Sequence, residues 1–290
     1  MGGAAHDVGG DALTRGRLRF VTMVLAGLGC VTGCRFEMLD RRFVYFPTAW
    51  QARDWKALSG LPLEEVWLTT SDGVRIFGWY VEAHNRQGVL LWCHGNAGTI
   101  IDRLDNLREL ERYGLSAFLF DYRGYGQSHG APSEEGLYRD AVAAYEYVTQ
   151  TRHIAPTELV VFGRSLGAAV AGELARRRPV AGLILETPFP SIEAVGRMLY
   201  GGLPVHRLLA ARFDLAARLK EIRVPVLVLH GDRDTVIPFA LGERVFEAAN
   251  EPKGFYRIVG ADHNDTYLVG GEAYFQRLVQ FVRHVTTPKR

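Results

Sequence analysis

Residues 159–170 read LVVFGRSLGAAV, an apolar run that is followed by two glycines around Ser165 and then by an alanine-rich run. The pattern predicts a short buried strand, a sharp turn at Ser165 and a helix that stops at Pro179. A serine on such a turn is exposed, and the N-terminus of the helix directs free N–H groups and a positive dipole end toward it. Ser165 is therefore a candidate nucleophile.

A second G-x-S-x-G pattern lies at 126–130 and surrounds Ser128. It also follows an expected strand, but Ala131, Pro132 and Ser133 come next, and no helix begins at the serine. Ser128 therefore lacks both the sharp turn into a helix and the helix dipole. We interpret 126–130 as a glycine-rich loop.

Short apolar runs alternate with helical periods along the chain. The strand-like runs lie at 89–93, 116–120, 159–162, 182–185, 226–229 and 256–259, and the helical periods at 101–110, 137–148 and 275–281. Nearly continuous apolar runs are typical of parallel strands that are buried on both faces. Residues 66–70 and 74–81 flank Ser71-Asp72-Gly73 and predict a β-hairpin. The expected fold class is α/β, a doubly wound, mostly parallel sheet.

Residues 188–222 depart from this alternation, because they contain several glycines and prolines between two expected strands. We interpret them as short helices that form a small helical cap over the sheet edge. An ordinary long crossover with one irregular helix fits the same residues.

The partners of Ser165 are expected in the order Ser, Asp or Glu, His. His263 lies in a short polar loop after the last expected strand, at the edge where open α/β sheets place their sites. Asp232 and Asp234 compete for the role of the acid. Asp234 lies further along its loop and can reach back to the histidine, whereas Asp232 is placed to brace the turn. Spacing alone leaves both open.

The loop His94-Gly95-Asn96-Ala97-Gly98 follows the strand at 89–93. In such folds this loop supplies one of the two N–H groups that bind an oxyanion. The backbone amides of Asn96 and Leu166 are the candidates. A glycine-rich turn that caps the next helix fits the same loop, and one loop can do both. His94 and His230 each lie between a strand and a glycine, which favours a structural hydrogen-bonding role.

The N-terminus has the features of a targeting segment. Arg15, Arg17 and Arg19 precede an uncharged stretch at 20–34, which is shorter than the about 20 residues that a transmembrane helix needs. Its end, Val31-Thr32-Gly33-Cys34, resembles the lipobox of bacterial lipoproteins, in which the cysteine thiol takes a lipid. A short uncleaved anchor is the alternative, and a start codon further in is also open.

The expected organisation has three parts. Residues 1–33 form a signal peptide or anchor, residues 34–62 form a tether, and residues 63–290 form one domain with the cap at about 188–222.

Composition excludes several classes of protein. Of the 290 residues, 48% are hydrophobic and 23% are charged, which excludes a disordered, a collagen-like and a polytopic membrane protein. A net charge of +2 gives no argument for binding nucleic acid. Three cysteines cannot form a disulfide framework. The sequence contains no cluster of His, Cys or carboxylates at metal-ligand spacing, so we expect neither a metal nor another cofactor.

Together these motifs resemble the α/β-hydrolase superfamily, especially its serine-aminopeptidase-like branch, which includes membrane-anchored protein depalmitoylases. The matching blocks lie at 44–47, 94–98, 121–128, 163–167, 231–238 and 263–265. The resemblance implies a serine hydrolase with the triad Ser165, Asp234 and His263, which cleaves an ester, thioester or amide bond in a small-molecule or acylated substrate. It favours Asp234 over Asp232 as the acid.

The resemblance has one departure and one alternative. Relatives usually carry glycine where this chain has Asp262, and a carboxylate there could raise the pKa of His263 or crowd the loop. The expected location is a bacterial cell envelope, where the N-terminal lipid or anchor holds the protein on the membrane. The alternative is a non-catalytic lipoprotein that keeps the fold as a binding surface, and a degraded triad would favour it.

We predict that Cys34→Ala abolishes acylation and leaves the domain catalytically competent, because the lipid is attached to the thiol and the domain lies downstream. Incorporation of labelled palmitate into the two proteins measures this. Equal labelling of wild type and variant would contradict the assignment of Cys34.

Overall fold

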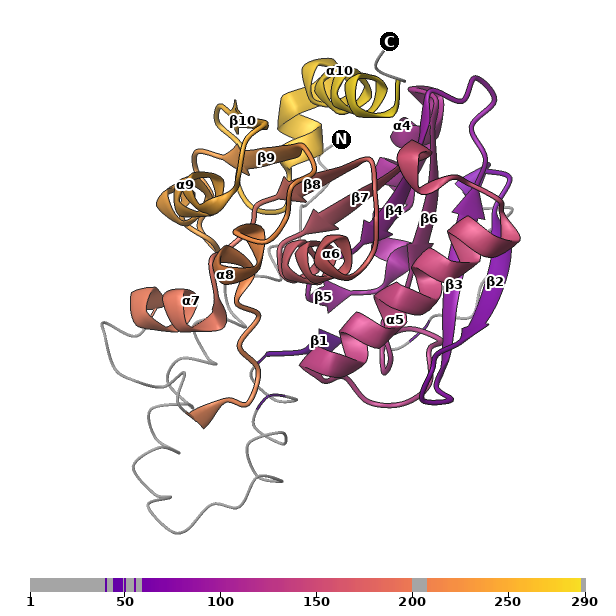
Figure 1. Ribbon diagram of the computed structural model, residues 1–290, viewed down its shortest axis with the longest axis horizontal. Coiled ribbons are helices and arrows are strands. Elements are labelled where there is room, and N and C mark those ends of the chain that lie inside the picture. Colours follow the sequence, from indigo (N-terminus) through magenta and orange to yellow (C-terminus); the bar gives the residue numbers. More distant parts are fainter. Residues whose placement is uncertain are drawn as a thin grey trace, which may run out of the picture.

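The computed structural model describes residues 40, 44–48, 50, 55, 59–199 and 208–287. Its centre is an eight-stranded sheet with the strand order β10-β9-β8-β7-β4-β6-β3-β2 (Figure 1). These strands are β2 (Glu64–Thr69), β3 (Arg75–Val81), β4 (Gly88–Cys93), β6 (Leu115–Phe120), β7 (Leu159–Arg164), β8 (Gly182–Glu186), β9 (Val226–Gly231) and β10 (Lys253–Ile258).

The sheet is mostly parallel, as the sequence predicts. Strands β6, β4, β7, β8, β9 and β10 pair in parallel with one another. Strand β3 pairs antiparallel with both β2 and β6, and the turn between β2 and β3 completes the expected hairpin. Gly73 in that turn has φ 80°, a conformation that glycine adopts without strain.

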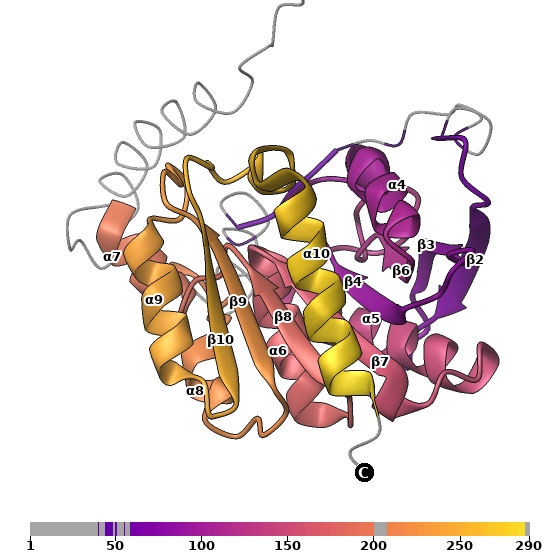
Figure 2. The same ribbon diagram turned by 90° about the horizontal axis from the view of Figure 1, so that it is seen from above.

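Helices cover both faces of the sheet, so the expected doubly wound arrangement is confirmed. One layer contains α5 (Glu134–Glu146), α6 (Leu166–Arg177), α8 (Leu215–Leu219) and α9 (Phe239–Ala248). The other contains α4 (Leu104–Arg112) and α10 (Thr266–Thr286). Figure 2 shows α10 and α4 in front of the sheet and α6 behind it.

Alternation along β4 explains the two cores. Val89, Leu91 and Cys93 pack among the residues of the α5, α6 and α9 layer. Leu90 and Trp92 point the other way and pack with residues of α4 and α10. Successive side chains of a strand point to opposite faces, so an uninterrupted apolar run is what a strand between two helical layers requires.

The edge strand β10 differs from the expected range of 256–259. It begins at Lys253 and ends at Ile258, and Val259 is 74% exposed. An edge strand has a neighbour on one side only, and β10 pairs with β9 alone among the described strands. Partial exposure along β10 weakens the apolar pattern that identifies the central strands.

The segment expected to form a cap contains α7 (Ile192–Leu199) and α8. Residues 200–207 lie outside the described part of the chain. Helix α8 contacts α6 and α9, so it belongs to the layer of crossover helices. Short helical segments are present at 188–222, as expected. That they form a cap and not an ordinary long crossover stays a prediction.

The predicted signal segment at 1–33 and Cys34 lie outside the described residues. Among the residues that the structure describes, no helix combines the length and the apolarity needed to cross a membrane. Part of the expected tether is described, and it forms β1 (Phe46–Pro47), which pairs in parallel with β5 (Ala97–Gly98) (Figure 1).

The contact between α6 and the end of β4 is very close. A Cβ at Gly167 would overlap the carbonyl oxygens of Cys93 and His94, which are backbone atoms. Another glycine of the same helix, Gly172, has less demanding surroundings, since a Cβ there would meet only the tip of the Leu215 side chain. Backbone cannot move aside as a side chain can.

We predict that Gly167→Ala lowers the free energy of unfolding by about 1–3 kcal/mol, the usual cost of overpacking. Gly172→Ala, the matched control, should cost less, because alanine favours the helix by about 1 kcal/mol over glycine and Leu215 can adjust. Urea unfolding of both variants measures the difference. Equal stability of the two would show that the helix moves away from β4 at little cost.

Candidate active site

Ser165 lies at the turn between β7 and α6, where the sequence predicts it. Its backbone has φ 53° and ψ −118°, a conformation that costs energy for a residue with a side chain. The turn is held from outside, because the N–H of Ser165 donates to the carbonyl of Glu186 at 2.9 Å. Leu166 is the first residue of α6, so the helix N-terminus lies directly beside the serine.

His263 joins Ser165 to Asp234. Its Nε2 lies 3.1 Å from Ser165 Oγ, and its Nδ1 lies 2.7 Å from Asp234 Oδ2. An ionised carboxylate only accepts, so the proton belongs on Nδ1 and Nε2 is free to accept from the serine hydroxyl. The three predicted side chains therefore form one hydrogen-bonded chain at the carboxyl ends of β7, β9 and β10.

Several donors keep Asp234 ionised. Burial raises the pKa of its carboxyl, but hydrogen bonds from His230 and His263 outweigh burial and lower this pKa below its usual range. The second oxygen, Oδ1, accepts the backbone N–H groups of Val236 at 2.9 Å and Ile237 at 2.7 Å. Backbone groups thus orient the carboxylate independently of its contact with the imidazole.

The competing carboxylate has a different set of partners. Asp232 forms an ion pair with Arg257 at 2.8 Å and accepts the N–H of Gly260 at 2.7 Å. It braces the neighbouring strand and the turn after it, as the sequence analysis suggested. Its two carboxylate oxygens thus face Gly260 and Arg257.

Ser128 uses its hydroxyl for structure. It is buried, accepts the N–H of Phe77 at 2.8 Å and donates to the carbonyl of Asp121 at 2.7 Å. Both hydrogen-bonding functions of the hydroxyl therefore hold the loop after β6 against β3.

The histidines expected to have structural roles make backbone contacts. His94 Nδ1 lies 2.7 Å from the carbonyl of Gly95, and burial lowers the pKa of His94 to about 3. His230 Nε2 lies 2.8 Å from the carbonyl of Ile237 and 3.3 Å from Asp234 Oδ2. A carbonyl only accepts, so Nε2 of His230 carries a proton and can also face the carboxylate. The contact with Asp234 was not anticipated from the sequence.

The loop after β4 lies next to the serine. A Cβ at Gly95 would lie 3.6 Å from the Cβ of Ser165, so this loop passes beside the turn. Asn96 follows, and its side-chain Oδ1 accepts from the N–H of Phe46 at 3.3 Å and from the hydroxyl of Tyr125 at 3.0 Å. The loop therefore passes beside the turn at Ser165 one residue before Asn96.

Two further residues support His263 and were missed as site residues. Arg164 Nη2 donates to the carbonyl of His263 at 2.5 Å, and its guanidinium lies 3.7 Å from buried Glu186. The sequence carries Arg164 at a variable position of G-x-S-x-G, so the motif gives no signal for it. Only the fold brings it to a residue that lies 99 positions away.

Asp262 is the second supporting residue. Its Oδ1 accepts the backbone N–H groups of Thr235 and His263, both at 2.7 Å. The carboxylate therefore links the loop of the acid to the loop of the histidine. Asp262 is thus accommodated in its loop by hydrogen bonds to backbone groups of both loops.

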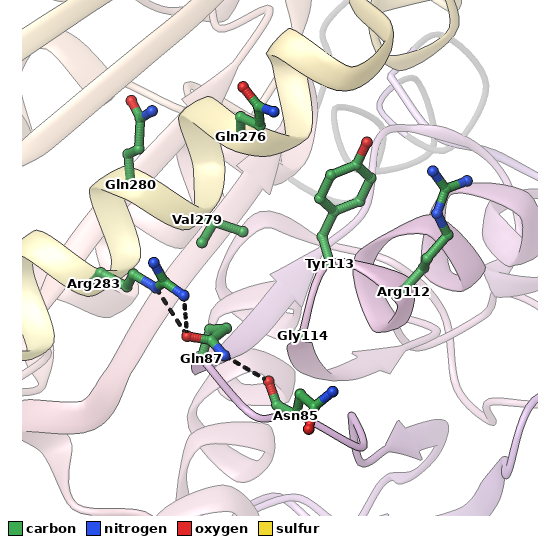
Figure 3. A pocket seen from close by; sticks show the side chains of 9 residues that line it. All are labelled: Asn85, Gln87, Arg112, Tyr113, Gly114, Gln276, Val279, Gln280 and Arg283. Carbon is green, nitrogen blue, oxygen red and sulfur yellow. Dashed lines mark hydrogen bonds between the residues drawn. The ribbon is translucent and has the colours of Figure 1, made fainter.

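A depression lies at the other end of the sheet (Figure 3). It is lined by Asn85, Gln87, Arg112, Tyr113, Gly114, Gln276, Val279, Gln280 and Arg283. Arg283 donates to the side chain of Gln87, which donates to the carbonyl of Asn85. This depression is next to the amino ends of β4 and β6, whereas Ser165 follows the carboxyl end of β7.

Comparisons with known proteins agree with the fold. The family described as serine aminopeptidase, S33, matches residues 84–199. A protein of Mycobacterium tuberculosis, named only as uncharacterized, is 41% identical over 84% of this chain and 87% of its own length. The α/β-hydrolase domain-containing protein WAV2 of Arabidopsis thaliana is 34% identical over 78% of this chain and 80% of its own.

A third relative is named after an enzymatic activity. The lysophosphatidylserine lipase ABHD12 of Danio rerio is 36% identical over 60% of this chain and 51% of its own length.

Solved structures show the same fold. The esterase Pf2001 of Pyrococcus furiosus superposes with a TM-score of 0.69 at 19% identity, over 83% of this chain and 100% of its own. An α/β-hydrolase of Vibrio vulnificus has a TM-score of 0.69 at 20% identity, over 86% and 94%. WAV2 adds similarity in sequence to this similarity in fold, so the chain belongs to the α/β-hydrolase superfamily, and hydrolysis is its class of reaction.

Proposed function

We propose that this protein is a serine hydrolase that cleaves an ester, thioester or amide bond through an acyl-enzyme intermediate. The observation that carries the proposal is the hydrogen-bonded chain from Ser165 through His263 to Asp234. A serine hydroxyl is a weak nucleophile unless a base takes its proton during the attack. Here the base has a free Nε2 lone pair directed at that hydroxyl.

The proposed reaction has two halves. Ser165 Oγ attacks the carbonyl carbon while His263 Nε2 takes the hydroxyl proton, and the tetrahedral intermediate then expels an alcohol, thiol or amine that leaves with this proton. Water then attacks the acyl-enzyme in the same way, and a carboxylic acid and free Ser165 result. Asp234 stabilises the imidazolium in both halves because it remains ionised.

The negative oxygen of the intermediate needs fixed donors. The backbone N–H groups of Asn96 and Leu166 are the proposed pair, and the N-terminal end of α6 adds a favourable dipole. Gly95 lies beside the Cβ of Ser165, and this proximity supports the amide of the following residue as one of the donors. Donors that are already fixed need no reorganisation during the reaction.

An acylated substrate at a membrane suits the surroundings of the site. Asp40 is the sixth residue after Cys34, a reach of at most about 22 Å for an extended chain. A lipid on Cys34, or an anchor that ends there, would therefore hold the domain close to the bilayer of a bacterial cell envelope. Exposed apolar side chains also lie near the carboxyl ends of the parallel strands, where Ser165 lies. They are Phe46 beside β5, Val259 after β10, and Leu268 and Val269 in the first turns of α10.

Catalysis is favoured over a purely binding role. A binding surface on the same fold would not require a serine, a histidine and a carboxylate that are hydrogen-bonded in this order. The lipase name of the ABHD12 relative supports a carboxyl ester as the substrate, and the serine aminopeptidase description of the family supports an amide. A panel of acyl esters, thioesters and aminoacyl amides tests the bond type.

We predict that Ser165→Ala abolishes both turnover and labelling by a fluorophosphonate probe, and that Ser128→Ala keeps both. The hydroxyl of Ser165 contacts a base, whereas that of Ser128 bonds to backbone groups. Probe labelling of the two purified variants, with circular dichroism as the check on folding, gives the answer. Persistent labelling of folded Ser165→Ala would show that another residue is the nucleophile.

For the acid, we predict that Asp234→Asn lowers kcat by about 10⁴, as loss of the orienting acid does in a serine protease. The introduced amide N–H would face Nδ1, so the imidazole would take the tautomer that cannot accept from Ser165. Asp232→Asn is the matched control, and it should keep most of the activity. Comparable losses in both variants would contradict the assignment of roles.

A further inference from the structure

The part of the tether that the structure describes reaches the candidate active site. We call Asp40 and residues 44–47 the strap. The sequence predicts a tether in this region, and the contacts of the strap lie on the loop that carries Asn96 and on the segment before α8.

Asp40 fixes the start of the strap to the domain. Its two carboxylate oxygens accept the backbone N–H groups of Ala210 at 3.0 Å and Ala211 at 2.8 Å, and the side chain is buried. Tyr45 is also buried, and its ring packs edge-to-face on Phe213 with centroids 6.3 Å apart. The strap is therefore held on the domain at Asp40 and at Tyr45.

The end of the strap pairs with the loop after β4. Phe46 is opposite Ala97 and Pro47 is opposite Gly98 in a short parallel ladder (Figure 1). The N–H of Phe46 donates to Asn96 Oδ1 at 3.3 Å. A backbone N–H can only donate, so this contact identifies the side-chain oxygen of Asn96 and excludes the flipped amide.

The loop that receives the strap needs such support. Asn96 lies between Gly95 and Gly98, and Gly98 has φ 81°. Glycines leave the backbone much freedom, so the loop alone does not fix the direction of the Asn96 N–H. Two donors, the Phe46 N–H and the Tyr125 hydroxyl, converge on Asn96 Oδ1 and restrict the residue from outside.

We propose that the strap positions the oxyanion-binding amide of Asn96, and that Phe46 and Tyr125 act as positioning residues through the Asn96 side chain. This inference rests on the proposed function, because it concerns the same site. It makes the N-terminal region a part of the catalytic unit, so that the segment leading to the anchor also holds one oxyanion donor in place.

A matched pair of variants at one position tests the role of the Phe46 N–H. Phe46→Pro removes both the ring and the N–H, and proline is tolerated at the edge of a short strand. Phe46→Ala removes the ring and keeps the N–H. We expect kcat to fall on the order of five-fold more in Phe46→Pro than in Phe46→Ala, the effect of one neutral hydrogen bond.

The measured quantity is kcat per active site, because this value does not change when part of the protein is unfolded. A fluorophosphonate counts the active sites of the full-length protein, and kcat for a soluble acyl ester is divided by that count. The affinity for a boronic acid, which forms a tetrahedral adduct with the serine and places an oxygen at the oxyanion position, should weaken in parallel with kcat. A purely structural role would lower the count of sites and leave kcat per site unchanged.

A double-mutant cycle isolates the contact. In an Asn96→Ala background, Phe46→Pro should have the same kcat per site as Phe46→Ala, because the acceptor is already absent. If Phe46→Pro does not fold, Tyr125→Phe replaces it in the cycle, since it removes the other donor and keeps the ring.

The possible results distinguish a failure of the strap proposal from a failure of the proposed function. Wild type that shows no Ser165-dependent hydrolysis and no probe labelling would overturn the proposed function and the strap with it. Ser165-dependent hydrolysis together with equal kcat in Phe46→Pro and Phe46→Ala, or with fully additive effects in the cycle, would overturn the strap alone.

Discussion

The strained turn at Ser165 is the constraint on which the site depends. A positive φ at a serine persists only where the surroundings impose it. Here β7 fixes one side of the turn, the first turn of α6 fixes the other, and Gly167 lets that helix touch the carbonyl oxygens at the end of β4. The same contact that forces the turn also brings the loop of Asn96 beside the serine. Ser165 and the loop of Asn96 are thus placed by one packing arrangement between a helix and a strand end.

The second organising element is the carboxylate of Asp234, which accepts from two backbone amides and faces two histidines. Such a carboxylate can be buried and still carry its charge, because hydrogen bonds replace the lost water. His230 and His263 then have different duties, although both face the same oxygen. His230 donates to a carbonyl through Nε2 and is closed to the solvent, while His263 directs Nε2 at Ser165. The environment of each ring, and not its residue type, decides which one can act as a base.

Sequence patterns predict the parts of this protein that repeat a local rule. The buried parallel strands, the hairpin, the turn at Ser165 and the loops after the strands all follow from residues close together in the chain. The choice between Asp232 and Asp234 could not be made by spacing, because both follow the same strand and only the direction of each side chain separates them. Arg164 and Asp262 were missed as supports for a different reason: each acts on the backbone of a loop brought near by folding, and a backbone acceptor or donor leaves no mark in the sequence.

Contacts between distant parts of the chain therefore hold the loops in place, which the motifs alone cannot do. The G-x-S-x-G and His-Gly-Asn motifs contain glycines where the backbone must turn sharply or approach closely, and the same glycines leave their loops free to move. Each of these loops is held by a partner from elsewhere: Glu186 holds Ser165, Arg164 holds His263, and Phe46 holds Asn96. A catalytic geometry that tolerates little displacement needs such partners, because a misplacement of about 1 Å can cost 10²-fold in rate. The strap is one instance of this arrangement, and it differs from the others in following closely, along the sequence, the segment that we propose to carry a lipid or an anchor.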